Sequence, residues 1–278
     1  RHRPFVLEVR DLWPEFAIDM GVLKNPFLIR ASRWLERFLY RHAQHLIVNS
    51  PAYRDYLIGK GIAAAKVTLI PNGVDPAMFE QSTDSGEVRA RFGLGNCFVV
   101  TYAGALGMAN DLDTLLRAAH RLRDDQTIHF LLVGDGKERP NLEARAKELR
   151  LSNLTFTGPQ PKTQMSAILA ASDACVATLK DIRMFRTTYP NKVFDYMAAG
   201  RPTIVAIDGV IREVVEKSQG GIFVPPGNDA ALSEAVQRLS RDPASARKMG
   251  AAAKDYVTRH FHRQHQAEQL ASLLGKLA

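Results

Sequence analysis

The stretch 97–122, CFVVTYAGALGMANDLDTLLRAAHRL, joins an apolar run to an amphipathic segment through a turn that contains glycines. The run 97–104 is almost entirely apolar, which is typical of a strand buried on both faces of a sheet. In the segment 112–122 the apolar residues follow the i, i+3, i+4 spacing of a helix. A buried strand that leads through a glycine turn into a helix indicates an α/β fold.

The same alternation of apolar runs and helical segments continues along the chain. Further strands are expected at 128–134, 154–158, 174–178, 202–206 and 221–225, with helical spacing between them. This alternation predicts a parallel sheet covered on both faces, here a Rossmann-like domain over 81–260. Such a sheet binds ligands beyond the carboxyl ends of its strands. The spacing after 242 is helical, and 261–278 is expected to be a separate C-terminal helix.

Residues 1–80 form a shorter block of the same kind. Strands are expected within 4–10, 45–50 and 67–75, with a long helix at 25–44 and a second helix at 51–61. Two or three strands are fewer than an ordinary sheet contains, so the block is expected to be part of a Rossmann-like domain whose beginning is missing. The polar stretch 81–87 is expected to be the hinge between the two domains.

The composition is that of a soluble globular protein. The chain has 278 residues, of which 46% are hydrophobic and 24% charged, and this length suits two domains. The apolar runs are shorter than the ~18 residues of a membrane span, and no signal-peptide pattern is seen. Cys97 and Cys175 lie in apolar runs and form no disulfide framework. We therefore expect a reducing, cytoplasmic setting.

The net charge of +8 predicts an anionic partner, which can be nucleic acid, anionic lipid or a phosphorylated small molecule. Zinc-finger spacing and aromatic RNA-binding strands are absent from the sequence, which disfavours nucleic acid. The segment HFHRQH at 260–265 has no flanking Cys or Glu to complete a metal site, so no metal is expected there.

Two glycine turns follow predicted strands, and each allows two interpretations. Gly104 and Gly107 can let a phosphate approach the backbone at the start of a helix, or they can simply permit a tight turn. Asn110 or Asp111 is a candidate cap for that helix. The turn VGDGK at 133–137 leaves the same two interpretations open.

Two further loops follow predicted strands and are candidates for the wall of a binding cleft. The loop FTGPQPKTQM at 156–165 is stiffened by prolines and can hold a flat base, although a plain turn explains it equally well. In RDLWPE at 10–15, Arg10, Asp11 and Glu15 can line a cleft around Trp13. The alternative for RDLWPE is a surface loop pinned by a buried tryptophan.

The segment TTYPNKVFDYMAAGRP at 187–202 places a lysine where helix electrostatics disfavour one. The spacing after Pro190 is helical, with Asn191 as a candidate cap, so Lys192 lies in the first turn. A cation there costs ~0.3–1 kcal/mol unless an anion binds at the same helix end. A bound phosphate would explain Lys192, and Asp195 can face the same ligand. The alternative is a Lys–Asp surface pair worth only ~0.5 kcal/mol. Two arginines are second candidates for the phosphate contact: Arg183 and Arg186.

A set of motifs in a specific order covers essentially the whole chain: RDLWPE, IPNGVD, YAGALG, VGDGKER, FTGPQPK, NKVFDYMAAGRP and VPPGN. In this set the chain resembles the retaining glycosyltransferases of family 4, and it is most similar to the bacterial branch of the fucosamine-transferase type, which builds cell-surface polysaccharides. The resemblance implies a GT-B fold, in which two Rossmann-like domains face each other across a cleft. The C-terminal domain would bind the nucleotide-sugar donor and the N-terminal domain the acceptor. The resemblance also implies that much of the N-terminal domain is absent from this chain.

The resemblance assigns donor-binding roles by position. The turn at Gly104 and Gly107 matches the one beneath the donor diphosphate, and the loop at 159–161 matches the one that holds the base. Asp195 matches the second acid of a glutamate pair and would accept hydrogen bonds from the ribose hydroxyls. The expected donor-binding residues are Gly104, Gly107, Asn110, Pro159, Gln160, Lys192, Val193 and Asp195.

Three positions depart from the family pattern. The first glutamate of the pair falls at Thr187, an arginine after the first glycine falls at Ala105, and a lysine falls at Asn110. The cations that usually clamp the diphosphate are therefore missing from their places, and Lys192 is the expected substitute. The catalytic candidates are Arg10, which falls where many members have a histidine near the donor sugar, Asp11 and Thr187.

The resemblance implies transfer of a sugar, with retention, from a nucleotide donor to a lipid-linked saccharide acceptor in surface-polysaccharide biosynthesis. A UDP-linked N-acetylated sugar is the expected donor, and no metal cofactor is expected. The first alternative is a nucleotide-sugar 2-epimerase of the same fold, although the acids and histidine for proton abstraction are not found. The second is a non-catalytic nucleotide-sugar-binding module, which the losses at Thr187, Ala105 and Asn110 favour.

The helix expected near 25–42 also predicts contact with the inner face of the plasma membrane. Four arginines project within roughly a third of its circumference: Arg30, Arg33, Arg37 and Arg41. An adjacent face carries Leu28, Ala31, Leu35, Phe38 and Leu39, with Phe27 and Trp34 at the boundary. Aromatic residues at such a boundary favour the lipid headgroup level. The alternative is a helix packed on its own sheet with a solvated basic side.

Overall fold

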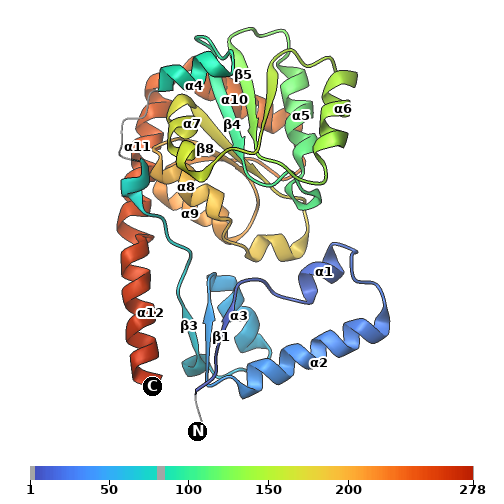
Figure 1. The fold of residues 1–278 in the computed structure, drawn as a ribbon, viewed down its shortest axis with the longest axis vertical. Coiled ribbons are helices and arrows are strands. Elements are labelled where there is room, and N and C mark those ends of the chain that lie inside the picture. Colours follow the sequence, from blue (N-terminus) through green and yellow to red (C-terminus); the bar gives the residue numbers. More distant parts are fainter. Residues whose placement is uncertain (1–3, 80–84, 278) are drawn as a thin grey trace.

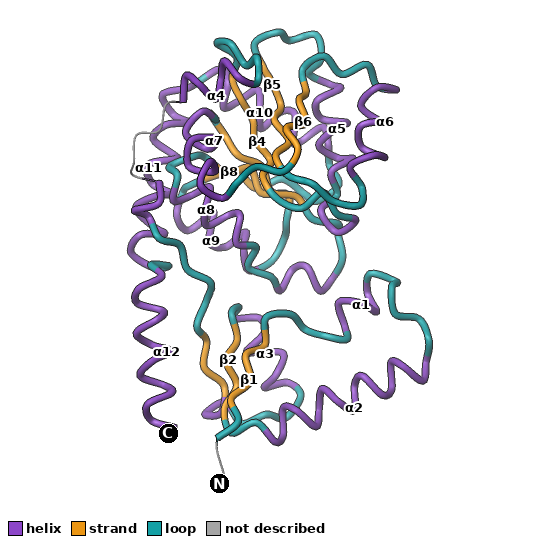
Figure 2. The backbone as a smooth tube through the Cα atoms, viewed as in Figure 1, coloured by secondary structure: helices purple, strands orange, loops and turns teal. Residues whose placement is uncertain are grey.

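The computed structural model of the chain describes residues 4–79 and 85–277. It contains two parallel β-sheets, one above the other in Figure 1, and Figure 2 shows the strands of each sheet with helices beside them. The α/β architecture with a complete C-terminal sheet and a small N-terminal sheet is the one predicted.

The C-terminal sheet has six parallel strands in the order β6-β5-β4-β7-β8-β9. All the strands predicted after residue 96 are confirmed: β4 (Phe98–Ala103), β5 (Ile128–Val133), β6 (Leu154–Gly158), β7 (Ala174–Thr178), β8 (Thr203–Ala206) and β9 (Gly221–Phe223). The chain moves outward from β4 to β6 and then returns to the other side of β4. The order therefore reverses between β4 and β7, and in such sheets the crevice for a ligand lies at this reversal.

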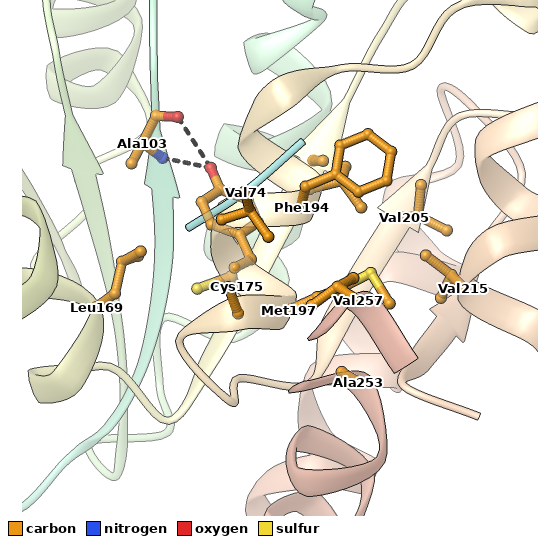
Figure 3. Close-up of a cluster of buried hydrophobic side chains, with 14 of the residues drawn as sticks. Val74, Ala103, Leu169, Cys175, Phe194, Met197, Val205, Val215, Ala253 and Val257 are labelled. Carbon is orange, nitrogen blue, oxygen red and sulfur yellow. Dashed lines mark hydrogen bonds between the residues drawn. The ribbon is translucent and has the colours of Figure 1, made fainter. Parts of the chain in front are cut away.

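Side chains that alternate along β4 enter two separate cores. Val99 and Ala103 pack with α7 (Met165–Ala171), α8 (Asn191–Ala198), α9 (Val210–Ser218) and α11 (Pro243–His260). Val100 and Tyr102 pack on the other face with α5 (Leu112–Arg121), α6 (Arg139–Glu148) and α10 (Asp229–Arg241). Figure 3 shows the first core. Burial on both faces explains why the strands are apolar without alternation.

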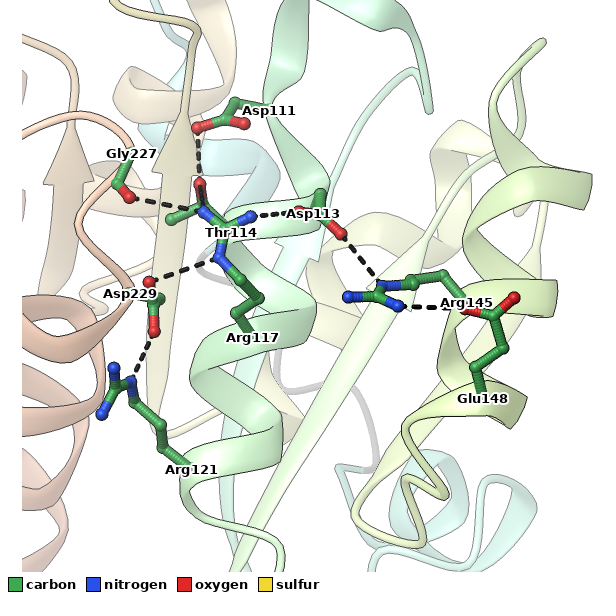
Figure 4. A network of polar contacts seen from close by, with 9 residues as sticks. All are labelled: Asp111, Asp113, Thr114, Arg117, Arg121, Arg145, Glu148, Gly227 and Asp229. Carbon is green, nitrogen blue, oxygen red and sulfur yellow. Dashed lines mark hydrogen bonds and ion pairs between the residues drawn. The ribbon is translucent and has the colours of Figure 1, made fainter.

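An ion-pair network joins the three helices of the second face (Figure 4). Arg117 of α5 pairs with Asp113 and lies 3.3 Å from Asp229 of α10, which also pairs with Arg121. Asp113 reaches Arg145 of α6 at 3.6 Å. Hydrogen bonds from Arg121 and Arg117 lower the pKa of Asp229.

The N-terminal sheet has three parallel strands in the order β1-β2-β3. Its elements are β1 (Val6–Val9), α1 (Glu15–Asp19), α2 (Pro26–His42), β2 (His45–Val48), α3 (Pro51–Gly59) and β3 (Val67–Leu69). The predicted strands and helices are confirmed, but β3 ends earlier than expected and α1 was not predicted. The chain then crosses to the other sheet, where Val74 is buried in the core on the α8 side.

The polar stretch 81–87 is not a hinge over its whole length, because α4 (Ser85–Arg91) starts within it. Its residues 81–84 lie outside the described residues. The predicted C-terminal helix is α12 (Arg263–Leu277), which runs back beside the N-terminal sheet (Figure 1). Val74 accepts a backbone hydrogen bond from Arg263 and donates one to Phe261, both at 2.9 Å. The start of α12 therefore fastens the crossing segment.

Candidate active site between the two sheets

Two adjoining cavities lie between the sheets. The larger, of about 770 Å³, is lined by the loop after β4, the first turns of α8, the loop before α7 and the crossing segment 72–79. The smaller, of about 450 Å³, is lined on the N-terminal side by Arg10, Asp11 and Trp13. Both cavities share Arg10, Asn72 and Asn191, so they form one continuous site at the carboxyl ends of the strands.

Lys192 lines the larger cavity, and its ammonium points toward Tyr102 and Asn110. Nζ donates to the Tyr102 hydroxyl at 2.6 Å and to Asn110 Oδ1 at 3.0 Å, and it lies 4.2 Å from the centre of the Tyr102 ring. Burial lowers the pKa of Lys192 to about 7, because its neighbours here are dipoles rather than carboxylates. Within the described part of the chain, no ion pair joins Lys192 to Asp195, so the surface-pair alternative is wrong.

Gly104 provides the room that this ammonium occupies. A Cβ at Gly104 would lie 3.0 Å from Lys192 Nζ, and the backbone φ of +153° favours glycine. Gly107 has φ −113°, and a Cβ there would meet Asn110 Nδ2 at an ordinary 3.6 Å. Gly107 and Asn110 are not among the described residues that line the cavity, and Asn110 acts through Lys192.

The second glycine turn is explained by packing. A Cβ at Gly134 would lie 2.0 Å from the Gly104 carbonyl oxygen, and one at Gly136 would lie 2.3 Å from that of Leu106. Both distances are far below van der Waals contact, so the turn after β5 supports the turn after β4 by direct backbone contact. Of the two interpretations, the tight turn therefore applies to 133–137.

Asp195 faces the same cavity as Lys192, as the i+3 spacing predicted. Burial raises the pKa of Asp195 to about 6, although Arg263 and Lys162 act in the opposite direction. The next residue, Tyr196, fixes the helix against β4: its hydroxyl accepts from the Ala103 N–H at 2.8 Å and donates to the Ala103 carbonyl at 2.9 Å.

The start of α8 differs from the prediction in one detail. Asn191 is the first helical residue, not the cap, because Pro190 occupies the cap position and offers no side-chain acceptor. The first N–H groups of a helix have no partner within it, so those of Asn191 and Lys192 are available at the cavity wall. Val193 is fully buried, and its N–H bonds to the Pro190 carbonyl at 3.1 Å. The Val193 side chain therefore belongs to the core.

The base-loop candidates lie next to the cavity wall. Gln160 accepts from Arg91 at 3.0 Å and donates to the Thr157 carbonyl at 3.0 Å. From this loop, Lys162 and Thr163 line the cavity, whereas Pro159 and Gln160 are not among the described lining residues.

Thr187 joins the two domains. Its carbonyl accepts from the Ser50 hydroxyl at 2.5 Å, and its own hydroxyl donates to the Met184 carbonyl at 2.5 Å. It is not among the described residues that line either cavity, so contact with a substrate does not follow from its position. The second-choice arginines, Arg183 and Arg186, do not line the cavities either, and Arg186 pairs with Asp181 at 3.0 Å.

The RDLWPE loop forms the N-terminal wall of the site. Trp13 is 60% exposed beside the smaller cavity, so a surface loop pinned by a buried tryptophan is wrong. Glu15 turns away and binds Arg33 of α2 at 2.9 Å. The structure adds side chains that sequence reasoning missed, all lining the larger cavity: Asn72, Lys162 and Arg263. Arg263 carried no local signal, because α12 brings it back from the end of the chain.

Comparison with known proteins identifies the family. Residues 97–242 match the family model "Glycosyl transferases group 1", which covers more than half of the chain, and residues 1–73 match "Glycosyl transferase 4-like domain". The chain belongs to the group 1 glycosyltransferases.

This glycosyltransferase chain is similar to the putative colanic acid biosynthesis glycosyl transferase WcaI of Escherichia coli K12, with 23% identity over 95% of the chain and 66% of WcaI. It is 30% identical to the lipopolysaccharide core biosynthesis glycosyltransferase LpsD of Rhizobium meliloti, over 60% of the chain and 46% of LpsD. The chain thus spans less than two thirds of the length of these curated relatives.

Solved structures share the GT-B fold of this glycosyltransferase. Anabaena HepE in complex with UDP superimposes with a TM-score of 0.83 at 22% identity, covering 99% of this chain and 72% of HepE. Sucrose-phosphate synthase from Thermosynechococcus elongatus gives a TM-score of 0.80 at 24% identity, covering 98% of this chain and 67% of that protein. At these identities the likeness concerns the fold alone.

Proposed function

We propose that this chain carries the donor site, and part of the acceptor site, of a retaining glycosyltransferase of the fucosamine-transferase branch. It would move a sugar from a UDP-linked donor, with an N-acetylated sugar as the expected group, to a lipid-linked saccharide in surface-polysaccharide biosynthesis. The observation that carries the proposal is the charge of the larger cavity, whose wall holds four cations and one carboxylate: Arg10, Lys162, Lys192, Arg263 and Asp195. Such a wall suits a nucleoside diphosphate.

The relatives support this choice of substrates. HepE has been solved with UDP and with UDP-glucose, which favours a UDP-linked donor for a cavity in the same fold. WcaI and LpsD are described as enzymes of colanic acid and lipopolysaccharide core biosynthesis, which favours a surface saccharide as the acceptor.

In the proposed reaction, Asp195 accepts hydrogen bonds from the ribose, and the cations with the α8 N–H groups hold the diphosphate. The bond between the anomeric carbon and the diphosphate oxygen breaks, and the acceptor oxygen bonds to that carbon from the same face. The departing diphosphate takes the acceptor proton. Charge that develops on the leaving diphosphate is stabilised by groups already in place, which is often the largest catalytic contribution.

The smaller cavity is the proposed acceptor site. Trp13 offers an exposed indole face for the apolar face of a sugar ring, and Asp11 can accept from a hydroxyl. Asn49 is only 8% exposed and donates to the Arg10 carbonyl at 3.3 Å. Its Oδ1 has no hydrogen-bond partner among the described residues, so a sugar hydroxyl would satisfy it.

A lipid-linked acceptor requires the protein to work at a membrane surface, and α2 has the composition for this. None of the described helices is long and apolar enough to cross a bilayer. Phe27 of α2 is 82% exposed and Trp34 is 60% exposed. The rings of Trp34, Phe38 and His42 stack along the helix, with centroid distances of 5.5 and 4.0 Å. We place the protein on the cytoplasmic face of the plasma membrane, with α2 toward anionic lipid.

The test is turnover by the full-length protein with a panel of UDP-sugars and lipid-linked saccharides. Acceptor-dependent release of UDP, unchanged by EDTA, supports metal-independent transfer. Epimerisation at C2 without an acceptor would instead support the 2-epimerase. Binding without turnover across the panel would support a non-catalytic nucleotide-sugar-binding module.

A further inference from the structure

Among the described residues, the hydrogen-bond partners of the Lys192 ammonium are neutral. They come from separate elements: the Tyr102 hydroxyl of β4 and the side-chain carbonyl of Asn110. A Cβ at Gly104 would lie 3.0 Å from the same ammonium. The other charged groups of the same cavity are Asp195, Arg10, Lys162 and Arg263. Turning an ammonium away from water is unfavourable unless an anion compensates for the lost solvation. No carboxylate of the described residues pairs with the Lys192 ammonium, so an anionic ligand would supply the missing partner.

Two neighbours direct the ammonium along the cavity wall. The Tyr102 hydroxyl accepts from Lys192 and donates to the Ala105 carbonyl at 2.8 Å. Asn110 donates through Nδ2 to the same carbonyl at 3.0 Å while its Oδ1 accepts from Lys192. Both neighbours are therefore held by the turn after β4, and they hold the lysine in turn.

The start of α8 lies beside this ammonium. No side chain caps the helix, and the N–H groups of Asn191 and Lys192 have no partner among the described residues, whereas that of Val193 bonds to the Pro190 carbonyl. A phosphate bound there would meet both the helix end and Lys192.

We propose that Lys192, which reaches the site from α8 and is oriented by Tyr102 and Asn110, is the cation that binds the donor diphosphate. This inference rests on the proposed function and names the residue that supplies the charge. The family resemblance places a lysine at position 110, where this chain has Asn110. Lys192 on α8 would then replace the lysine that the resemblance places at position 110, because its ammonium lies 3.0 Å from Asn110 Oδ1.

The experiment compares UDP with uridine, because uridine lacks the diphosphate. Full-length protein and the Lys192→Met variant are titrated with UDP by calorimetry and with uridine by NMR. Lys192→Met should weaken UDP binding by roughly 10- to 150-fold, as expected for a hydrogen bond to a charged group, and should leave uridine binding unchanged. Lys192→Gln, which keeps a donor for Tyr102 without the charge, should weaken UDP binding similarly and serves if Lys192→Met fails to fold.

A rescue variant separates this role from a structural one. Asn110→Lys in the Lys192→Met background should regain most of the lost UDP affinity, since it returns an ammonium to the same place. Lys217→Met is the matched control, because Lys217 is an exposed partner of Glu213 on α9, and it should leave UDP binding unchanged. Unchanged UDP affinity in both Lys192→Met and Lys192→Gln would overturn this inference but not the proposed function. Failure of the wild type to bind UDP would overturn the proposed function and the inference with it.

Discussion

Replacement of three arginines on α2 should release the protein from anionic membranes. The structure corrects the set of four expected from the sequence, because Arg33 is engaged by Glu15 at 2.9 and 3.0 Å. Among the described residues, no ion pair involves Arg30, Arg37 or Arg41. At 100° per residue these three fall within about 40° of one another on the helix. They therefore form a narrow stripe beside the exposed rings of α2.

The size of the effect follows from this count. A basic side chain near an anionic lipid surface contributes about 1 kcal/mol, so the three free arginines contribute about 3 kcal/mol. The triple variant Arg30→Gln, Arg37→Gln, Arg41→Gln should therefore bind phosphatidylserine-containing vesicles roughly 100-fold more weakly. Arg33→Gln is the matched control and should change binding little, since its guanidinium is already paired.

The assay is vesicle flotation of the full-length protein at low salt, with neutral vesicles in parallel. Binding of wild type should fall as salt is raised, because exposed charges are screened. Equal flotation of wild type and the triple variant would refute the reasoning. So would a Trp34 that acrylamide cannot quench in the absence of vesicles, since that result would mean that another part of the protein covers this face of α2.

Three further outcomes are expected. Because burial raises the pKa of Asp195 to about 6, the negative charge of Asp195 destabilises the fold as pH rises from about 4 through 6. Asp195→Asn should therefore raise the free energy of unfolding by roughly 2–3 kcal/mol at pH 8 and by far less at pH 4.5, and it should weaken UDP binding. Equal gains at both pH values in urea titrations would contradict this. Gly134→Ala should destabilise the fold by more than about 3 kcal/mol because its Cβ would strike the Gly104 carbonyl, whereas Gly107→Ala should change stability by less than about 1 kcal/mol. Similar losses of stability for the two variants in thermal unfolding would contradict this. Trp13→Ala should raise the KM for the acceptor at least tenfold without changing UDP affinity, and an unchanged acceptor KM would remove Trp13 from the acceptor site.

The fold was predictable because burial on both faces leaves a plain trace in the sequence. Each strand of the larger sheet is an apolar run, and each helix between them keeps its spacing, so the elements follow from local pattern alone. The site was predictable only in part. The position of Lys192 in the first turn of a helix was visible in the sequence. The contact between Lys192 and Tyr102 was not, because it depends on the space that Gly104 leaves in the tertiary structure. The proposed Asn191 cap was wrong because Pro190 occupies the cap position. Arg263 was missed because no local sequence pattern shows that α12 brings this residue from the end of the chain to the cavity.

The backbone contact between Val74 and the start of α12 has a mechanical consequence. The chain passes from the N-terminal to the C-terminal domain through the crossing segment 72–79 and returns at the start of α12. Backbone hydrogen bonds of Val74 with Phe261 and Arg263 join these two passages. They therefore act as a single pivot rather than as two loose tethers. Gly73 and Arg263 sit at this pivot, while Arg10 and Lys192 belong to opposite lobes. A movement of one domain relative to the other would therefore leave the wall near Arg263 in place and would change the distance between Arg10 and Lys192.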